Sequence, residues 1–206
     1  MLETGVIGVV RTESSKELLQ VAEAIRAGGV RCIEIAMTTP NALRVIEEVA
    51  SELEDVLVGA GTVLDPETAR AAILAGAEYL VSPTLNFKVI ELAKRYGKIA
   101  IPGAFSPTEI LAAWEAGADI VKVFPATRLG PQYFKDIKAP LPQVRLMPTG
   151  GVDANNAADF IRAGADVICV GSALVDKEAI AEGRFEVLTE NARRLLAAVK
   201  EGRGRS

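Results

Sequence analysis

The chain has 206 residues, of which half are apolar and 24% are charged, and it contains no histidine. This length and composition support a globular protein with its own core, and they exclude a disordered chain, a collagen-like chain and a disulfide scaffold. The absence of histidine excludes Ser-His-Asp and Cys-His hydrolysis, His-ligated zinc and histidine acid–base catalysis. Proton transfer in an enzyme of this composition falls to carboxylates, lysine, tyrosine, bound phosphate or water.

The net charge of −4 and a pI near 5.1 argue against nucleic acid or an acidic membrane surface as a partner. The two cysteines, Cys32 and Cys169, lie inside apolar runs, and buried reduced thiols are typical of cytoplasmic proteins. No apolar run approaches the ~20 residues that a transmembrane helix needs. We therefore expect a soluble cytoplasmic protein that is not exported.

Short β-branched runs alternate with longer amphipathic stretches along the chain. The predicted strands are Val6–Val10, Cys32–Met37, Val56–Val63, Tyr79–Pro83, Ile99–Phe105, Ile120–Pro125, Val144–Thr149 and Val167–Leu174. The predicted helices are Ser15–Ala27, Ala42–Leu53, Pro66–Ala75, Phe87–Tyr96, Pro107–Ala116, Pro131–Lys138, Asn155–Ala163 and Arg184–Lys200. Apolar strands separated by helices of this length indicate βα units with a parallel sheet buried on both faces.

Helix boundaries are marked by capping residues. Helix starts are predicted at Thr12–Ser15, Asp65–Glu67, Ser106–Glu109 and Asp153–Asn155, and left-handed glycine caps at Gly29, Gly76, Gly117 and Gly164. No linker or composition break divides the sequence, so we expect one domain over residues 1–206. Eight strands in one small domain favour a compact (β/α)8 barrel, with a doubly wound open sheet as the alternative.

Two charged residues interrupt apolar strands. Lys122 shares a strand face with Ile120 and Phe124, and Glu34 shares a face with Cys32 and Ala36. If the alternate residues of the Glu34 strand pack against the outer helices, Glu34 points into the barrel. An apolar environment favours the neutral form of a lysine, and a neutral amine can form a Schiff base with a carbonyl group. A nearby carboxylate would then supply the proton transfers.

Glycine-rich segments end the last two predicted strands. They contribute Thr149, Gly150 and Gly151 from one strand and Gly171 and Ser172 from the next. Exposed amides and hydroxyls at this place in a (β/α)8 barrel commonly bind phosphate. A third glycine-rich segment, Gly59–Val63, brings Thr62 to the barrel mouth, although close backbone packing without a ligand explains it equally well.

The sequence resembles a known family of enzymes over about residues 6–200. The resemblance rests on Glu34, Gly59–Val63, Ser82-Pro83, Ile101–Gly103, Val121–Ala126 and Pro148–Val152, in this order. These motifs are similar to those of the class I aldolases for 2-keto-3-deoxy-6-phosphogluconate and 4-hydroxy-2-oxoglutarate. The resemblance implies a (β/α)8 barrel, usually a homotrimer, that cleaves the keto-acid phosphate to pyruvate and D-glyceraldehyde 3-phosphate without a metal or cofactor.

The same resemblance implies roles for individual residues. Lys122 would be the Schiff-base lysine and Glu34 the general acid and base. Thr62, Pro83 and Phe124 would line the pyruvate pocket, and Thr149, Gly150, Gly151, Gly171 and Ser172 would hold the phosphate.

One position departs from the family pattern. Many members have an arginine shortly after the glutamate, where it binds the substrate carboxylate, but residues 35–40 contain none. Arg11 at the end of the first predicted strand is the expected replacement, because relatives selective for the galactonate epimer have an arginine there. A surface residue at the barrel rim is the alternative, and the departure leaves the preferred epimer open.

Several other interpretations compete with the aldolase. Lys122 and Glu34 could act as acid and base without a covalent imine in a phosphate-binding barrel isomerase or synthase. They could also form a buried structural ion pair in a barrel that binds ligands without turnover. An all-carboxylate magnesium site stays formally open as well.

Overall fold

The computed structural model describes residues 1–11 and 17–204. Short parallel strands form the centre of this described part of the molecule. The strands are β1 (Val6–Val10), β2 (Cys32–Ala36), β3 (Leu57–Gly61), β4 (Tyr79–Val81), β5 (Ile99–Ile101), β6 (Gly103–Ala104), β7 (Val121–Val123), β8 (Leu146–Pro148) and β9 (Ile168–Val170). All of the ladders between them are parallel. The predicted parallel sheet is therefore confirmed.

The strands close into a barrel. One sheet has the order β5-β4-β3-β2-β1-β9 and the other the order β6-β7-β8. A parallel bridge between Thr149 and Cys169 joins β8 to β9, and Pro102 connects β5 to β6 along the chain. Pro102 has no N–H to donate to the ladder, so the predicted strand Ile99–Phe105 is divided there. With β5 and β6 taken as one interrupted strand, the described residues form the predicted compact (β/α)8 barrel.

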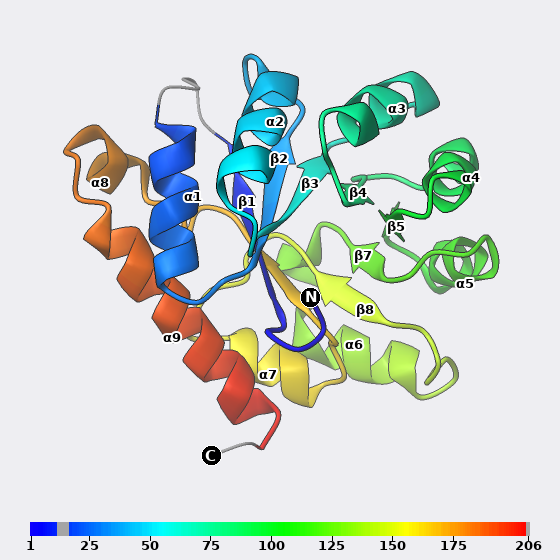
Figure 1. Cartoon of the computed structure of the whole chain (residues 1–206). Coiled ribbons are helices and arrows are strands. Elements are labelled where there is room, and N and C mark those ends of the chain that lie inside the picture. Colours follow the sequence, from blue (N-terminus) through cyan, green and yellow to red (C-terminus); the bar gives the residue numbers. More distant parts are fainter. Residues whose placement is uncertain (12–16, 205–206) are drawn as a thin grey trace.

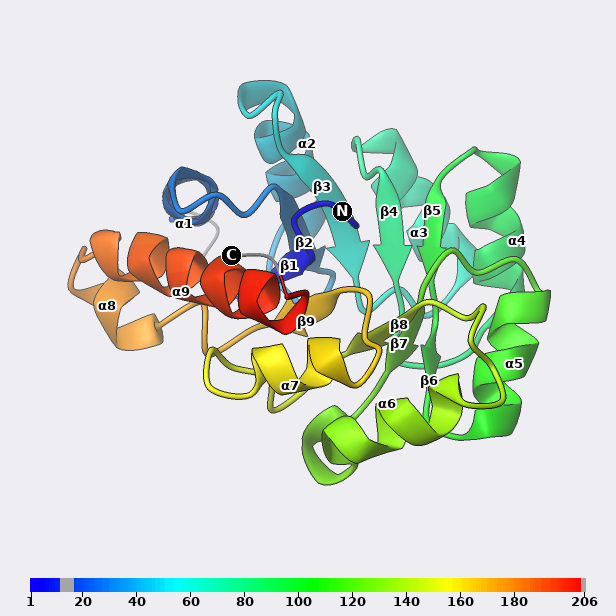
Figure 2. The same cartoon turned by 90° about the horizontal axis from the view of Figure 1, so that it is seen from below.

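Helices surround the strands (Figure 1). They are α1 (Leu18–Ala27), α2 (Ala42–Glu52), α3 (Pro66–Leu74), α4 (Phe87–Arg95), α5 (Pro107–Glu115), the 3-10 turn η1 (Ala126–Arg128), α6 (Gly130–Lys138), α7 (Ala157–Arg162), α8 (Lys177–Ala181) and α9 (Glu186–Gly202). The short helix α8 was not predicted. The terminal helix α9 packs against α1 and crosses it obliquely (Figures 1 and 2). Thr189 Oγ1 on α9 donates a hydrogen bond to the carbonyl of Ala24 on α1 at 2.8 Å.

Most of the predicted helix boundaries are found in the structure. Asp65 accepts from the N–H of Thr68 at the start of α3, and Ser106 forms a capping box at the start of α5. Asp153 binds the N–H groups of the turn before α7 instead, and α7 begins later, at Ala157. The predicted start at Thr12–Ser15 lies outside the described residues. The glycine caps all have positive φ, and they are Gly29, Gly76, Gly117 and Gly164.

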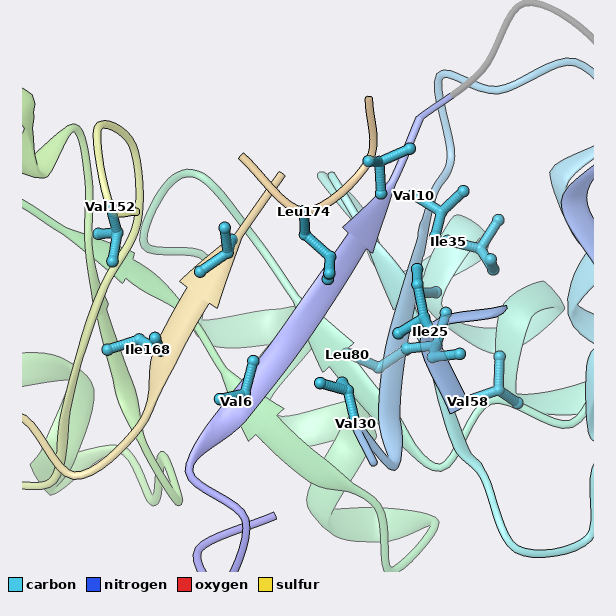
Figure 3. Close-up of a cluster of buried hydrophobic side chains, with 14 of the residues drawn as sticks. Val6, Val10, Ile25, Val30, Ile35, Val58, Leu80, Val152, Ile168 and Leu174 are labelled. Atoms are coloured by element: carbon cyan, nitrogen blue, oxygen red, sulfur yellow. The ribbon is translucent and has the colours of Figure 1, made fainter. Parts of the chain in front are cut away.

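Strand alternation divides the buried side chains into two groups. Val6, Val10, Ile35 and Leu80 belong to the large cluster between strands and helices (Figure 3). A smaller cluster fills the barrel interior and consists of Ile7, Cys32, Tyr79, Val81, Ile101, Ile120, Met147, Val167 and Cys169. Glu34 and Lys122 add two charged side chains to this interior face, one from β2 and one from β7.

In the described ranges 1–11 and 17–204, every helix is too short or too polar to span a lipid bilayer.

Candidate active site

A pocket of about 810 Å³ opens at the carboxyl ends of the strands. Every site residue predicted from the sequence lines it: Arg11, Glu34, Thr62, Pro83, Lys122, Phe124, Thr149, Gly150, Gly151, Gly171 and Ser172. These residues come from seven strands that are far apart in the sequence, namely β1, β2, β3, β4, β7, β8 and β9. The fold brings them together because the carboxyl ends of parallel barrel strands meet on one face.

Glu34 points into the barrel. Its neighbours Ile33 and Ile35 pack in the outer cluster, so alternation along β2 directs the carboxyl group inward. The side chain is only 2% exposed. Burial raises the pKa of Glu34, while the charge of Lys122, a hydrogen bond from Cys169 and the charge of Arg11 oppose that shift. A carboxyl group with a raised pKa is suited to act as a general acid as well as a general base.

Lys122 reaches the same pocket from β7. Val121 and Val123 pack in the outer cluster, which directs Lys122 inward, and its side chain is 6% exposed. The Nζ atom lies over the ring of Phe124, 5.1 Å from the ring centroid. Phe124 thus forms an aromatic wall beside the amine and restricts its position.

Lys122 and Glu34 share the pocket wall without forming an ion pair with each other in the described part of the chain. Their interaction is a longer-range attraction, because the charge of Lys122 lowers the pKa of Glu34. The pocket gives a ligand direct access to both groups. This arrangement differs from the closed structural ion pair that the sequence also permitted.

The backbone is unusual beside the two charged residues. Thr62 has a φ of 59°, a left-handed conformation that is rare for a β-branched residue and is concentrated at functional sites. Its preceding residue, Gly61, has no side chain, and a Cβ there would collide with Oε1 of Glu34. The end of β3 is therefore shaped around the Glu34 carboxyl group.

The predicted phosphate loops are ordered by local hydrogen bonds. Gly150 and Gly151 have φ angles of 92° and 72°, which only glycine adopts without strain. The side chain of Asn156 donates to the carbonyl of Gly151 at 2.8 Å. Gly171 faces open space, because the nearest atom to a Cβ placed there would be Cβ of Val9, at 4.0 Å.

The pocket also contains residues that the sequence analysis missed. They are Val9, Val152, Asp153, Cys169, Ala173, Val175, Asp176, Lys177 and Glu178. Cys169 lies two residues before Gly171, so strand alternation could have placed it on the pocket face. Lys177 and Glu178 belong to α8, a helix that was not predicted from the sequence, so no sequence pattern pointed to these two residues.

Within the described ranges, no three side chains of the metal-ligating types gather closely enough to hold a metal ion. Independence from metal stays a prediction that a chelator experiment tests.

A buried amine and a buried carboxyl group on the wall of one pocket, at the carboxyl-end face of the barrel, are typical of an active site in an enzyme of the (β/α)8 class. The particular family follows from sequence comparison. The family profile described as KDPG and KHG aldolase matches residues 1–190, and the chain belongs to this family. It is therefore a lyase of the aldolase type.

Individual relatives agree with this membership. The chain is 39% identical to the 2-dehydro-3-deoxy-phosphogluconate aldolase of Treponema pallidum, over 94% of this chain and 93% of the relative. It is 36% identical to the 2-dehydro-3-deoxy-6-phosphogalactonate aldolase of Escherichia coli, over 82% and 81% of the two chains. A solved KDPG aldolase from Legionella pneumophila, with pyruvate captured as a covalent carbinolamine, superposes with a TM-score of 0.86 at 30% identity and covers 93% of each chain.

Proposed function

We propose that the protein is a Schiff-base aldolase that cleaves 2-keto-3-deoxy-6-phosphogluconate to pyruvate and D-glyceraldehyde 3-phosphate. The observation that carries the proposal is the buried Lys122 amine beside the buried Glu34 carboxyl group in one open pocket. The names of the similar proteins from Treponema pallidum and Legionella pneumophila support the substrate and the covalent chemistry.

Lys122 is the nucleophile in this proposal. Its Nζ attacks the C2 carbonyl carbon of the substrate, and the carbinolamine loses water to give a protonated imine. The imine then accepts the electron pair of the C3–C4 bond as that bond breaks, while the C4 hydroxyl gives its proton to the Glu34 carboxylate. D-Glyceraldehyde 3-phosphate leaves and an enamine remains on Lys122. Protonation at C3 and addition of water release pyruvate and the free amine.

Glu34 moves the protons in these steps. It protonates the departing hydroxyl of the carbinolamine and exchanges a proton with C3 during interconversion of imine and enamine. Burial raises the pKa of Glu34, and the charge of Lys122 opposes that shift.

The keto-acid end of the substrate lies against Thr62, Pro83 and Phe124 in this proposal, and Arg11 binds the carboxylate. Arg11 is exposed at the end of β1 and faces the pocket, so its guanidinium can pair with a carboxylate that enters from solvent. Arg11 also supports a second candidate substrate, the galactonate epimer, which appears in the name of the Escherichia coli relative. Cleavage rates of the two epimers, measured side by side, decide between them.

The phosphate end of the substrate lies against Thr149, Gly150, Gly151, Gly171 and Ser172 in this proposal. Glycine exposes backbone amides that donate charge-assisted hydrogen bonds to an anion. Lys177 on the same pocket wall adds positive charge at the mouth. The rim carboxylates of Asp153 and Asp176 already accept backbone hydrogen bonds.

A homotrimer in the cytoplasm completes the proposal. Leu64 and Phe87 are 51% and 55% exposed, and their segments of the chain are joined by a hydrogen bond from the Asn86 side chain to the Leu64 carbonyl. An exposed apolar pair of this kind supports burial against another subunit. The free thiols of Cys32 and Cys169 fit a reducing compartment. Light scattering of the purified protein, with a Leu64→Lys variant as comparison, tests the trimer.

Borohydride reduction in the presence of pyruvate tests the covalent step. A Schiff-base aldolase gains a stable pyruvate adduct whose mass is found on the peptide that contains Lys122. An isomerase or synthase that uses Lys122 without an imine gains none, and a purely binding barrel shows no turnover. Unchanged cleavage after EDTA treatment separates the proposed mechanism from one that needs a bound metal.

A further inference from the structure

The carboxyl group of Glu34 is held from two sides. Cys169 on β9 donates a hydrogen bond from its thiol to Oε2 of Glu34, with a sulfur–oxygen distance of 3.6 Å. On the other side, Oε1 lies where a side chain at position 61 would be. The carboxyl plane is therefore fixed between a thiol and a glycine.

Cys169 is well placed to act as a rigid donor. It is 1% exposed, and its backbone forms the bridge to Thr149 that closes the barrel between β8 and β9. Burial raises the pKa of Cys169, and the nearby Glu34 charge raises it further. The sulfur consequently keeps its proton near neutral pH and can donate it to a carboxylate.

We propose that Cys169 is a positioning residue for the aldolase reaction, because its S–H group orients Glu34 and stabilises the carboxylate form that removes the C3 proton. The inference rests on the proposed aldolase function and adds a residue to it. Cys169 itself touches no reacting atom in this scheme.

Other groups around Glu34 cannot replace this donor. Lys122 from β7 and Arg11 after β1 act on Glu34 through their charges. Tyr79 from β4 lies near enough to feel the Glu34 charge, but its hydroxyl has no hydrogen-bond partner among the described residues. Cys169 is thus the hydrogen-bond donor to the Glu34 carboxyl group within residues 1–11 and 17–204.

The barrel interior offers a matched control. Cys32 is also a buried cysteine, 1% exposed, and it lies on the same face of β2 as Glu34. It makes no hydrogen bond to Glu34 in the described structure. Cys32→Ala therefore removes the same sulfur volume as Cys169→Ala without removing the donor.

The experiment measures exchange of the pyruvate methyl protons with deuterated solvent as a function of pH. Cys169→Ala should lower the exchange rate about three- to tenfold, as expected for loss of one hydrogen bond. The acidic limb of the pH–rate profile, where exchange rises as Glu34 loses its proton, should move to higher pH, because loss of the donor raises the pKa of Glu34. Cys169→Ser keeps an O–H donor and should restore most of the rate. Cys32→Ala should stay near the wild type in both respects.

A different pattern overturns the inference. If Cys169→Ala and Cys32→Ala lose the same activity and neither moves the acidic limb, then the Cys169 sulfur only fills space. If Cys169→Ala does not fold, Cys169→Val removes the donor with a side chain close in size: an acidic limb shifted to higher pH supports the proposal, and an acidic limb at the wild-type pH contradicts it. Borohydride trapping of pyruvate on the wild type tests the aldolase function separately, and a failure there removes the basis of both proposals.

Discussion

The carboxyl group of Glu34 on β2 fills the position that a side chain on Gly61, at the end of β3, would need. The register of the two strands pairs Gly61 with Ala36, which places Gly61 just above the glutamate. The small residues around Glu34 are therefore a condition for its orientation.

Gly61→Ala should displace Glu34 and lower the rate of pyruvate proton exchange by about 10²-fold or more, because the catalytic proton transfer depends on the carboxyl position. Gly61 does not have a left-handed φ, so alanine is compatible with the backbone and the protein should still fold. Steady-state exchange kinetics and a thermal melt measure the two effects. Wild-type exchange in Gly61→Ala would show that the Glu34 carboxyl group can act from another position.

Lys122→Ala should abolish the borohydride adduct with pyruvate and nearly all turnover, because Lys122 is the one buried lysine among the described residues, whereas Lys177 lines only the mouth of the pocket. Lys135→Ala is the control, since Lys135 is exposed on α6. Peptide mass mapping of the reduced protein measures the adduct directly. An adduct on Lys88, Lys94 or Lys135 in the wild type would contradict the assignment.

Glu34→Gln keeps the size of the side chain but removes the base, so exchange of the pyruvate protons should fall about 10²–10⁴-fold. Burial raises the pKa of Glu34, so the wild-type carboxylate forms at a higher pH than an ordinary glutamate. Exchange should therefore rise with pH through that raised value, and this acidic limb should disappear in Glu34→Gln. A surviving limb at the same pH would identify a different base.

The sequence was informative about this site because of strand alternation. A charged residue in an apolar run has few structural explanations, so Lys122 and Glu34 could be found without coordinates. Their inward direction followed from the packing of Ile33, Ile35, Val121 and Val123 on the helices. The positions of the strands along the chain and the glycine caps could be predicted for the same reason, because each depends on local pattern.

Other features depend on contacts between distant segments and were not predictable. The contact between Cys169 and Glu34 joins residues 135 positions apart, and no local pattern encodes it. The division of the strand at Pro102 had a visible cause in the sequence, yet the apolar run on both sides favoured one strand. Helix α8 is five residues long, too short for a helical period to be recognised.

Tyr79→Phe should stabilise the protein. The Tyr79 ring is fully buried beneath Gly59, and its hydroxyl has no hydrogen-bond partner in the described structure. Removal of a buried unpaired hydroxyl should raise the free energy of unfolding by about 1 kcal/mol. Tyr133→Phe is the matched control and should lower it, because the Tyr133 hydroxyl donates to the Phe105 carbonyl at 2.6 Å. Denaturant unfolding measures both, and a loss of stability in Tyr79→Phe would show that the hydroxyl is satisfied.

Gly171 is the position that best tests phosphate binding. A Cβ at Gly171 would meet only Cβ of Val9, at 4.0 Å, whereas Gly150 and Gly151 have left-handed φ angles that any other residue would strain. A side chain at Gly171 therefore enters the pocket without disturbing the fold. Substitutions at Gly150 would damage the loop whether or not phosphate binds there.

Gly171→Val should lower cleavage of 2-keto-3-deoxy-6-phosphogluconate about 10²-fold, because the side chain blocks hydrogen bonds between backbone amides and the phosphate. Cleavage of unphosphorylated 4-hydroxy-2-oxoglutarate should suffer much less, since that substrate places nothing beside Gly171. Remote phosphate binding also positions the reacting carbons, so the loss should appear in kcat as well as in KM. Parallel losses on both substrates in a folded variant would remove the phosphate from this loop. A wild type without preference for the phosphorylated substrate would make 4-hydroxy-2-oxoglutarate cleavage the better description of the activity.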